Sequence, residues 1–272
     1  MKKSKWVGLL AAGRMTESSL AKLPALVRAI GPIVAANRRL ASRYANVLRA
    51  GWAADPAELL NCRLVVVQAK QDEWCALSVR LPRTRCPVAL LDDDQDATMQ
   101  CQLRMAGVAA CTMGISPLAK RPVVLVDGDP AAVRAVRVWA AGGGVRCVEL
   151  KSGGRMSYRA GIVMVSALVT PLVDAATRSL RASGLGQVDS RRIVAHVLGG
   201  ALRSYDAHGR KGWPNPAAEG RRAAIAAQCK ALNGGEYGLG PLYSHVLTAC
   251  LEYYGQESEW LIESAGTAKA SK

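Results

Sequence analysis

Apolar runs of strand length alternate with amphipathic segments of helix length from residue 6 to about residue 150. Several runs, such as RLVVVQA at 63–69, are continuous and rich in valine, which is typical of parallel strands buried on both faces. The expected strands are 6–12, 32–36, 63–69, 87–91, 108–112, 122–127 and 145–150, and the expected helices are 17–30, 38–49, 71–80, 97–106 and 130–141. Strand followed by helix, repeated, predicts an α/β domain with a mostly parallel, doubly wound sheet.

The pattern changes after Gly153-Gly154, because no strand pattern follows and only helices are expected. These helices are 157–183, 189–206, 217–232 and 241–254. The longest apolar stretch, 160–173, is shorter than the roughly 20 residues that cross a bilayer. It is therefore expected to be the most buried helix of this region, with Gly161 in close contact with a partner helix. The predicted organisation is an α/β domain at 1–152, an all-α domain at 153–265 and a small, polar, disordered tail at 266–272.

Composition narrows the class of protein. The eight cysteines are scattered singly with no C-x-x-C, so no metal site is expected. The cysteines are expected to be reduced thiols of a cytoplasmic protein. The apolar run near the N-terminus is seven residues long and meets Arg14, which does not favour a signal peptide. The net charge of +15 comes from dispersed arginines without a basic run of five residues. A solvated arginine-rich surface is favoured over nucleic-acid binding, and no membrane partner is expected.

The first predicted strand leads into a turn that resembles a phosphate-binding loop, in the segment WVGLLAAGRMTES. A dinucleotide fingerprint would place glycine at Ala11, Gly13 and Thr16, and only Gly13 is present. Two interpretations stay open: Gly13 and Arg14 bind a pyrophosphate, or the loop has lost that role.

The end of the second predicted strand indicates which dinucleotide would bind. Asn37-Arg38-Arg39 lie 24 to 26 residues after Gly13, where an acidic residue would favour NAD, and no acid is present. Two guanidinium groups suit a 2′-phosphate, so the expected cofactor is NADP. The alternative is that these arginines simply open a surface helix. The predicted cofactor-binding set is Gly13, Arg14, Asn37, Arg38, Arg39 and Ala69, the last of these following the third strand.

Two further polar segments carry candidate catalytic residues. The junction KSGGRMSYRAG offers Lys151 and Tyr158, and a Tyr or Lys can act as a general acid toward a carbonyl. The segment LRSYDAHGRKGWPNP offers Arg210 and Lys211, which suit a small anionic substrate. The alternatives are a solvated linker and a contact between domains or subunits.

Several segments together resemble a group of bacterial proteins of unknown function. They are LPALVRAIGPIVAANRRLASRYANVLRAG, VLVDGDPAAVRAVRVWA, YRAGIVMVSALVTPL and LRSYDAHGRKGW. These proteins pair a Rossmann-like domain with a helical domain similar to the C-terminal domain of 6-phosphogluconate dehydrogenase. The whole is distantly similar to pyrroline-5-carboxylate reductase and ketopantoate reductase, over about residues 6–255.

The resemblance implies an NADP-dependent oxidoreductase ancestry and a homodimer built through the helical domain. Tyr158 matches the family pattern at the domain junction, and Arg210-Lys211 match the polar corner. Arg159 and Ala167 replace the His and Asn that relatives often carry, so a complete dehydrogenase set does not transfer. Two functional hypotheses follow: an NADP-dependent oxidoreductase, or a non-catalytic dimeric scaffold or ligand sensor that has kept the fold. Nucleic-acid binding, a third, rests on net charge alone.

Overall fold

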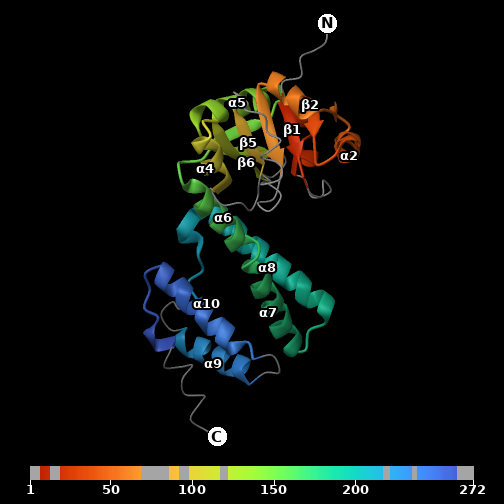
Figure 1. Ribbon diagram of the computed structural model, residues 1–272. Helices are drawn as coiled ribbons and strands as arrows, with labels where there is room; N and C mark the ends of the chain where they lie inside the picture. Colours follow the sequence, from red (N-terminus) through yellow and green to blue (C-terminus); the bar gives the residue numbers. More distant parts are fainter. Residues whose placement is uncertain are drawn as a thin grey trace. The chain divides into compact units, whose positions relative to one another are not determined.

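The computed structural model describes residues 7–12, 19–68, 86–91, 98–116, 122–216, 221–234 and 238–261. The chain divides into two compact units, Met1–Arg159 and Ala160–Lys272 (Figure 1). The boundary between them falls within one helix, α6, at Gly154–Val165.

An eight-stranded sheet forms the centre of the first unit, in the order β3-β2-β1-β4-β5-β6-β7-β8. Its strands are β1 (Val7–Ala11), β2 (Ile30–Val34), β3 (Trp52–Ala53), β4 (Leu64–Gln68), β5 (Val88–Leu91), β6 (Ala110–Ser116), β7 (Val123–Gly128) and β8 (Arg146–Glu149). All neighbouring pairs are parallel except β6 and β7. The mostly parallel sheet predicted from the sequence is therefore confirmed.

The antiparallel pair β6–β7 follows from the length of its connection. Six residues separate Ser116 from Val123, whereas a parallel crossover needs a dozen or more. Gly128 ends β7 with φ +148°, and a Cβ there would lie 2.6 Å from the Ala110 carbonyl oxygen. Glycine therefore permits the close approach of β7 to β6 at this end.

The helices of the first unit cover both faces of the sheet. They are η2 (Ser19–Lys22), α1 (Pro24–Val27), α2 (Arg38–Leu48), η3 (Pro56–Asn61), α4 (Thr98–Met105) and α5 (Pro130–Gly142). The described part of the expected helix 17–30 forms two short pieces, and the break falls at Pro24, which occupies the first turn of α1, as a proline within this segment predicts. The expected helix 71–80 lies outside the described residues.

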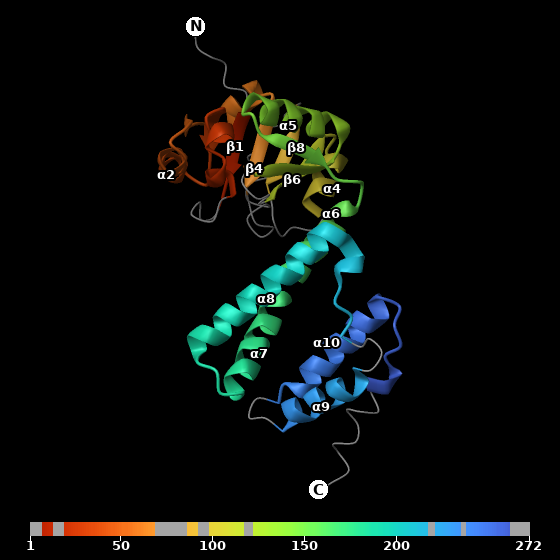
Figure 2. The same cartoon turned by 180° about the vertical axis from the view of Figure 1, so that it is seen from behind.

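Side chains alternate between two core layers along each central strand. Val66 belongs to the same core layer as Tyr44 of α2 and Trp139 of α5, on the face that Figure 2 shows covered by α5. Val65 and Val67 pack on the other face with residues of η3 and α4. This two-sided burial explains why the strands read as continuous apolar runs.

The second unit is helical throughout its described residues. After α6 come α7 (Val169–Ala182), α8 (Gln187–His208), the short η4 (Gly209–Gly212), α9 (Arg222–Asn233) and α10 (Gly240–Tyr253). A small core joins α9 to α10 and to Leu261. The all-α C-terminal region predicted from the sequence is confirmed.

Residues 160–173 were expected to form the most buried helix, and in the single chain this expectation is wrong. A turn at 166–168 separates α6 from α7, and neither helix contains a buried residue. A Cβ at Gly161 would meet no atom within 4 Å. By length and composition alone, residues 154–182 would suffice to cross a membrane, because an 18-residue window within them has a mean hydropathy of 1.7. The apolar pattern marks a surface that no described part of this chain covers.

Alkaline pH should destabilise the first unit through Cys111 of β6. Burial, with the nearby Cys147 and Asp129, raises the pKa of its thiol from 9.0 to about 12. The folded state then holds this proton more tightly than the unfolded state, so its stabilising contribution is complete below about pH 9 and lost as pH rises toward about 12. The free energy of unfolding of Cys111→Ala should decline less steeply above about pH 9 than that of the wild type. Cys101→Ala, at an exposed position, is the control, and an equal change in its slope would contradict the prediction.

Candidate functional site

The chain reverses its direction of travel across the sheet at β1. It moves outward from β1 to β2 and β3 and then crosses to β4 on the other side of β1. In open α/β sheets, ligands bind at the carboxyl ends of the strands beside such a reversal. At this edge the backbone N–H of Ala12 donates to the carbonyl of Gln68 at 2.8 Å, closing the ends of β1 and β4 together. Gly13, Arg14 and Ala69, predicted to bind the cofactor here, lie outside the described residues.

Asn37, Arg38 and Arg39 lie at the beginning of α2, just after β2. The Asn37 side chain accepts a hydrogen bond from the Leu40 backbone N–H at 2.8 Å and so caps the helix. Arg38 and Arg39 are exposed in the first turn, which contains no acidic residue. The arginines thus open a surface helix at the carboxyl edge of the sheet.

This arrangement suits a dinucleotide that carries a 2′-phosphate. A helix N-terminus attracts an anion through its backbone N–H groups and its dipole, and two guanidinium groups lie beside it. The described residues of this turn include no carboxylate that would repel the phosphate. Arg38 and Arg39 are accordingly the residues that would hold the phosphate, while Asn37 holds the helix.

A pair of hydroxyl groups occupies the same edge of the sheet further along. The Tyr158 hydroxyl, from α6, donates to the Ser116 Oγ at 2.7 Å. Ser116 is the last residue of β6 and is 6% exposed, and β6 runs parallel to β5, so the pair lies at the carboxyl edge. Tyr158 is half-buried, and both residues belong to the first unit.

Ser116 is a candidate functional residue that the sequence did not single out. The strand was expected to end at residue 112, but the ladder continues to Ser116. The available signal was the apolar character of MGI before the Ser116-Pro117 step, which marks a strand end. Its contact with a residue 42 positions away could not be read from the sequence.

The four predicted catalytic residues divide between the two units. Lys151 is exposed in the connection between β8 and α6, in the same unit as Tyr158. Arg210 and Lys211 lie in η4 of the second unit. The described residues include no group of three or more His, Cys, Asp or Glu side chains that could hold a metal ion.

Arg210 is held by aromatic residues at the end of α10. Its Nη2 donates to the Tyr253 carbonyl at 2.9 Å. Its guanidinium carbon lies 5.1 and 5.0 Å from the ring centroids of Tyr253 and Tyr254. Trp213 stacks on Tyr254 with 4.1 Å between centroids. Through these contacts Arg210 packs η4 against the end of α10.

Comparison with known proteins agrees with this architecture. Residues 122–248 match the model of a domain of unknown function, DUF2520. Residues 122–248 are therefore similar to DUF2520. The match runs from β7 to α10, so DUF2520 spans the end of the sheet and most of the helices. It includes three of the segments on which the family resemblance rests and confirms that resemblance for the architecture.

Solved structures share the fold of this protein over nearly its whole length. A protein from Thermotoga maritima is 14% identical, with a TM-score of 0.64 and coverage of 97% of this chain and 99% of that one. The imine reductase from Myxococcus stipitatus in complex with NADP+ is 16% identical, with a TM-score of 0.61 and coverage of 95% and 98%. The Streptomyces aurantiacus imine reductase is 16% identical, with a TM-score of 0.55 and coverage of 96% and 92%. No curated protein matches the chain in sequence.

Replacing Arg210 with alanine should destabilise the second unit. The change removes a charge-assisted hydrogen bond and two cation–π contacts at an exposed position, which together contribute about 1–2 kcal/mol. The neighbouring Lys211→Ala, also exposed, should change the free energy of unfolding by less than about 0.5 kcal/mol. Equal losses in denaturant unfolding of the two variants would show that the aromatic contacts contribute nothing.

Proposed function

We propose that this protein is an NADP-dependent oxidoreductase of the cytoplasm that reduces a carbonyl or imine group of a small anionic substrate. The Tyr158–Ser116 hydroxyl pair carries the proposal, because it places proton-transferring groups at the edge of the sheet where a dinucleotide would lie. Similarity of fold to an imine reductase that binds NADP+ supports it.

Different residues of this chain would bind the cofactor and supply the proton. Arg38 and Arg39 would bind the 2′-phosphate, and the nicotinamide would supply hydride. The Ser116 Oγ accepts a hydrogen bond from the Tyr158 hydroxyl, so the hydroxyl hydrogen of Ser116 is left to donate toward the substrate. Reduction of a C=O or C=N bond needs such a proton at the oxygen or nitrogen.

A second candidate is a non-catalytic scaffold or sensor that has kept the fold. The observation that favours it is the first turn, where Ala11 and Thr16 replace two fingerprint glycines. Titration with NADPH followed by tryptophan fluorescence separates the two candidates. Binding supports the oxidoreductase, and no binding at about millimolar NADPH supports the scaffold.

Removal of both arginines should change cofactor preference. The double variant Arg38→Ala/Arg39→Ala should bind NADPH about tenfold or more weakly, because each charge-assisted hydrogen bond to phosphate contributes about 1.5–3 kcal/mol. NADH binding should change little, since NADH has no 2′-phosphate. Arg43→Ala, exposed on the same helix, is the control. Equal losses for the two cofactors would show that the arginines do not recognise the phosphate.

Removal of the Tyr158 hydroxyl should slow reduction without weakening cofactor binding. Tyr158→Phe should lower the rate of NADPH consumption with a 2-oxo acid or a cyclic imine that carries a carboxylate by about 10²–10⁴-fold, the usual contribution of a general acid. Ser116→Ala should lower the same rate by a comparable factor, because it removes the hydroxyl through which Tyr158 reaches the substrate. Tyr205→Phe, at a position 59% exposed on α8, is the control. Full activity of Tyr158→Phe would remove Tyr158 from the proposed mechanism.

We also propose that a second copy of this chain covers the apolar surface of α7 and α8. The exposed apolar residues there include Leu172, Val188, Ile193, Val197, Leu198 and Leu202. Large exposed apolar side chains gathered on two packed helices favour an interaction site. Charged residues are interleaved along α8, including Asp189, Arg192 and Arg203, which suits the polar rim of a protein interface better than lipid.

The assembly is tested by a charge placed within this surface. Leu202→Glu, at a position 63% exposed, should convert a dimer to a monomer, measured by size-exclusion chromatography with light scattering. Val47→Glu, 47% exposed on α2, should leave the dimer intact. A monomeric wild type would contradict the proposal, and co-sedimentation of that monomer with lipid vesicles would assign the surface to a membrane instead.

A further inference from the structure

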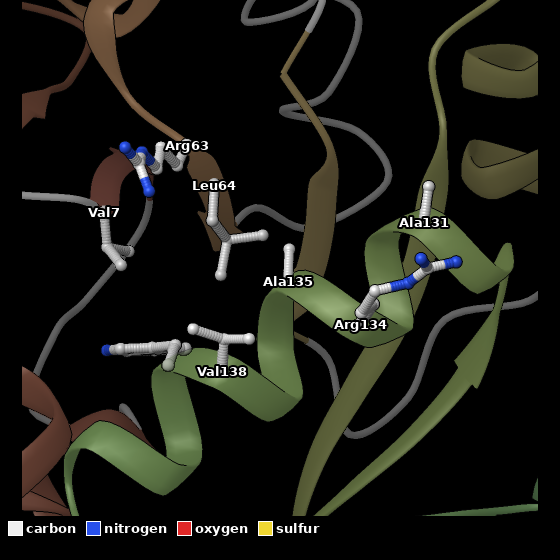
Figure 3. A pocket seen from close by; sticks show the side chains of 8 residues that line it. Val7, Arg63, Leu64, Ala131, Arg134, Ala135 and Val138 are labelled. Carbon is white, nitrogen blue, oxygen red and sulfur yellow. The ribbon is translucent and has the colours of Figure 1, made fainter.

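A pocket of about 380 Å³ opens on the first unit beside α5. Figure 3 shows its side chains, contributed by α5 and by the beginnings of two strands. Its lining residues are Val7, Arg63, Leu64, Ala131, Arg134, Ala135, Val138 and Trp139. This volume lies within the range of small-molecule sites in proteins, about 300–1,000 Å³.

The pocket is separate from the proposed cofactor site. Val7 and Leu64 are the first residues of β1 and β4, so the pocket lies at the amino edge of the sheet. The proposed cofactor site lies at the carboxyl edge of the same strands. A ligand in the pocket would therefore contact none of the residues proposed to bind NADP.

The wall of the pocket is apolar. The indole N–H of Trp139 donates to the Leu26 carbonyl at 3.2 Å, so the ring offers only carbon surface to the pocket. Val138 is 48% exposed and forms part of the rim on α5. Leu64 and Trp139 are buried and form the floor, so an apolar body in the pocket would remove chiefly the surface of Val138 from water.

The charged residues of the lining are both arginines. Figure 3 shows Arg63 and Arg134 at opposite ends, with Leu64 and Ala135 between them. No carboxylate is among the lining residues, so the local potential favours an anion. Arg63 has a further interaction within the chain, whereas Arg134 projects from the exposed side of α5, the helix that supplies most of the lining.

We propose that this pocket binds a small amphipathic carboxylate, such as a medium-chain fatty acid or an arylalkanoic acid. The apolar body lies against Leu64, Val138 and Trp139. The carboxylate pairs with Arg134, and Arg63 adds positive charge at the other end.

The test uses octanoate as the probe, with 1-octanol as its neutral counterpart, in isothermal titration calorimetry on the full chain. Octanoate should bind at one site per chain and 1-octanol about tenfold or more weakly. Arg134→Glu and Val138→Asp should each weaken octanoate binding by about tenfold or more, because both introduce a negative charge at the pocket. Both positions are exposed, so the fold should survive, and thermal melting checks this.

Arg43→Glu, exposed on α2, is the matched control because it makes the same change in net charge away from the pocket. Its octanoate affinity should stay within about twofold of the wild type. The proposal is overturned if octanoate does not bind, if 1-octanol binds equally well, or if Arg134→Glu and Arg43→Glu have equal effects. The Arg38→Ala/Arg39→Ala variant should bind octanoate normally, which keeps this result independent of the proposed oxidoreductase function.

Discussion

Burial of the central strands on both faces is the constraint on which the first unit depends. β1 and β4 pair in register from Val7 with Leu64 to Ala11 with Gln68, and their side chains alternate between two core layers. Each layer needs a cover, which α2 and α5 supply on one face and η3 and α4 on the other. The helices cover the two faces of the sheet, and both candidate ligand sites lie at the ends of the strands, one at the carboxyl edge and one at the amino edge.

The two edges differ in the chemistry they present. The carboxyl edge carries helix-terminal arginines after β2 and a hydroxyl pair at the end of β6, which suit a phosphate and a proton transfer. The amino edge presents carbon surface with arginines at its ends, which suits an apolar anion. A single sheet can therefore carry a reaction at one edge and an unrelated ligand at the other without shared residues.

The second unit follows a different principle, because its helices bury little apolar surface within one chain. Ile225, Cys229, Leu247, Leu251 and Leu261 form a small core between α9, α10 and the segment that follows. In α6 and α7 no residue is buried. Surface of this kind is costly in water, at roughly 25 cal/mol per Å², so a partner that covers it stabilises the unit as well as the assembly.

Several residues that the sequence suggested as catalytic or cofactor-binding also make contacts that stabilise the fold. Asn37 was expected to bind a cofactor, and its side chain caps α2. Arg210 was expected to be catalytic, and it packs on Tyr253 and Tyr254. The sequence shows a residue's type and its neighbours along the chain, whereas a residue's role depends on which side chains reach it in space. Tyr158 remains a candidate catalytic residue, because its partner, Ser116, lies at the carboxyl edge of the sheet.

The sequence by itself determined the elements whose signal is local. Seven of the eight strands and the change from α/β to all-α were predicted, since apolar runs, prolines and glycines act within a few residues. Only the tertiary structure decided which surfaces meet. The antiparallel β6–β7 pair, the two-residue β3 and the Ser116–Tyr158 contact all depend on segments distant along the chain or on pairing across the sheet. Exposure of 160–173 was missed for the same reason: an apolar pattern shows that a surface needs cover, and only packing shows whether the chain supplies it.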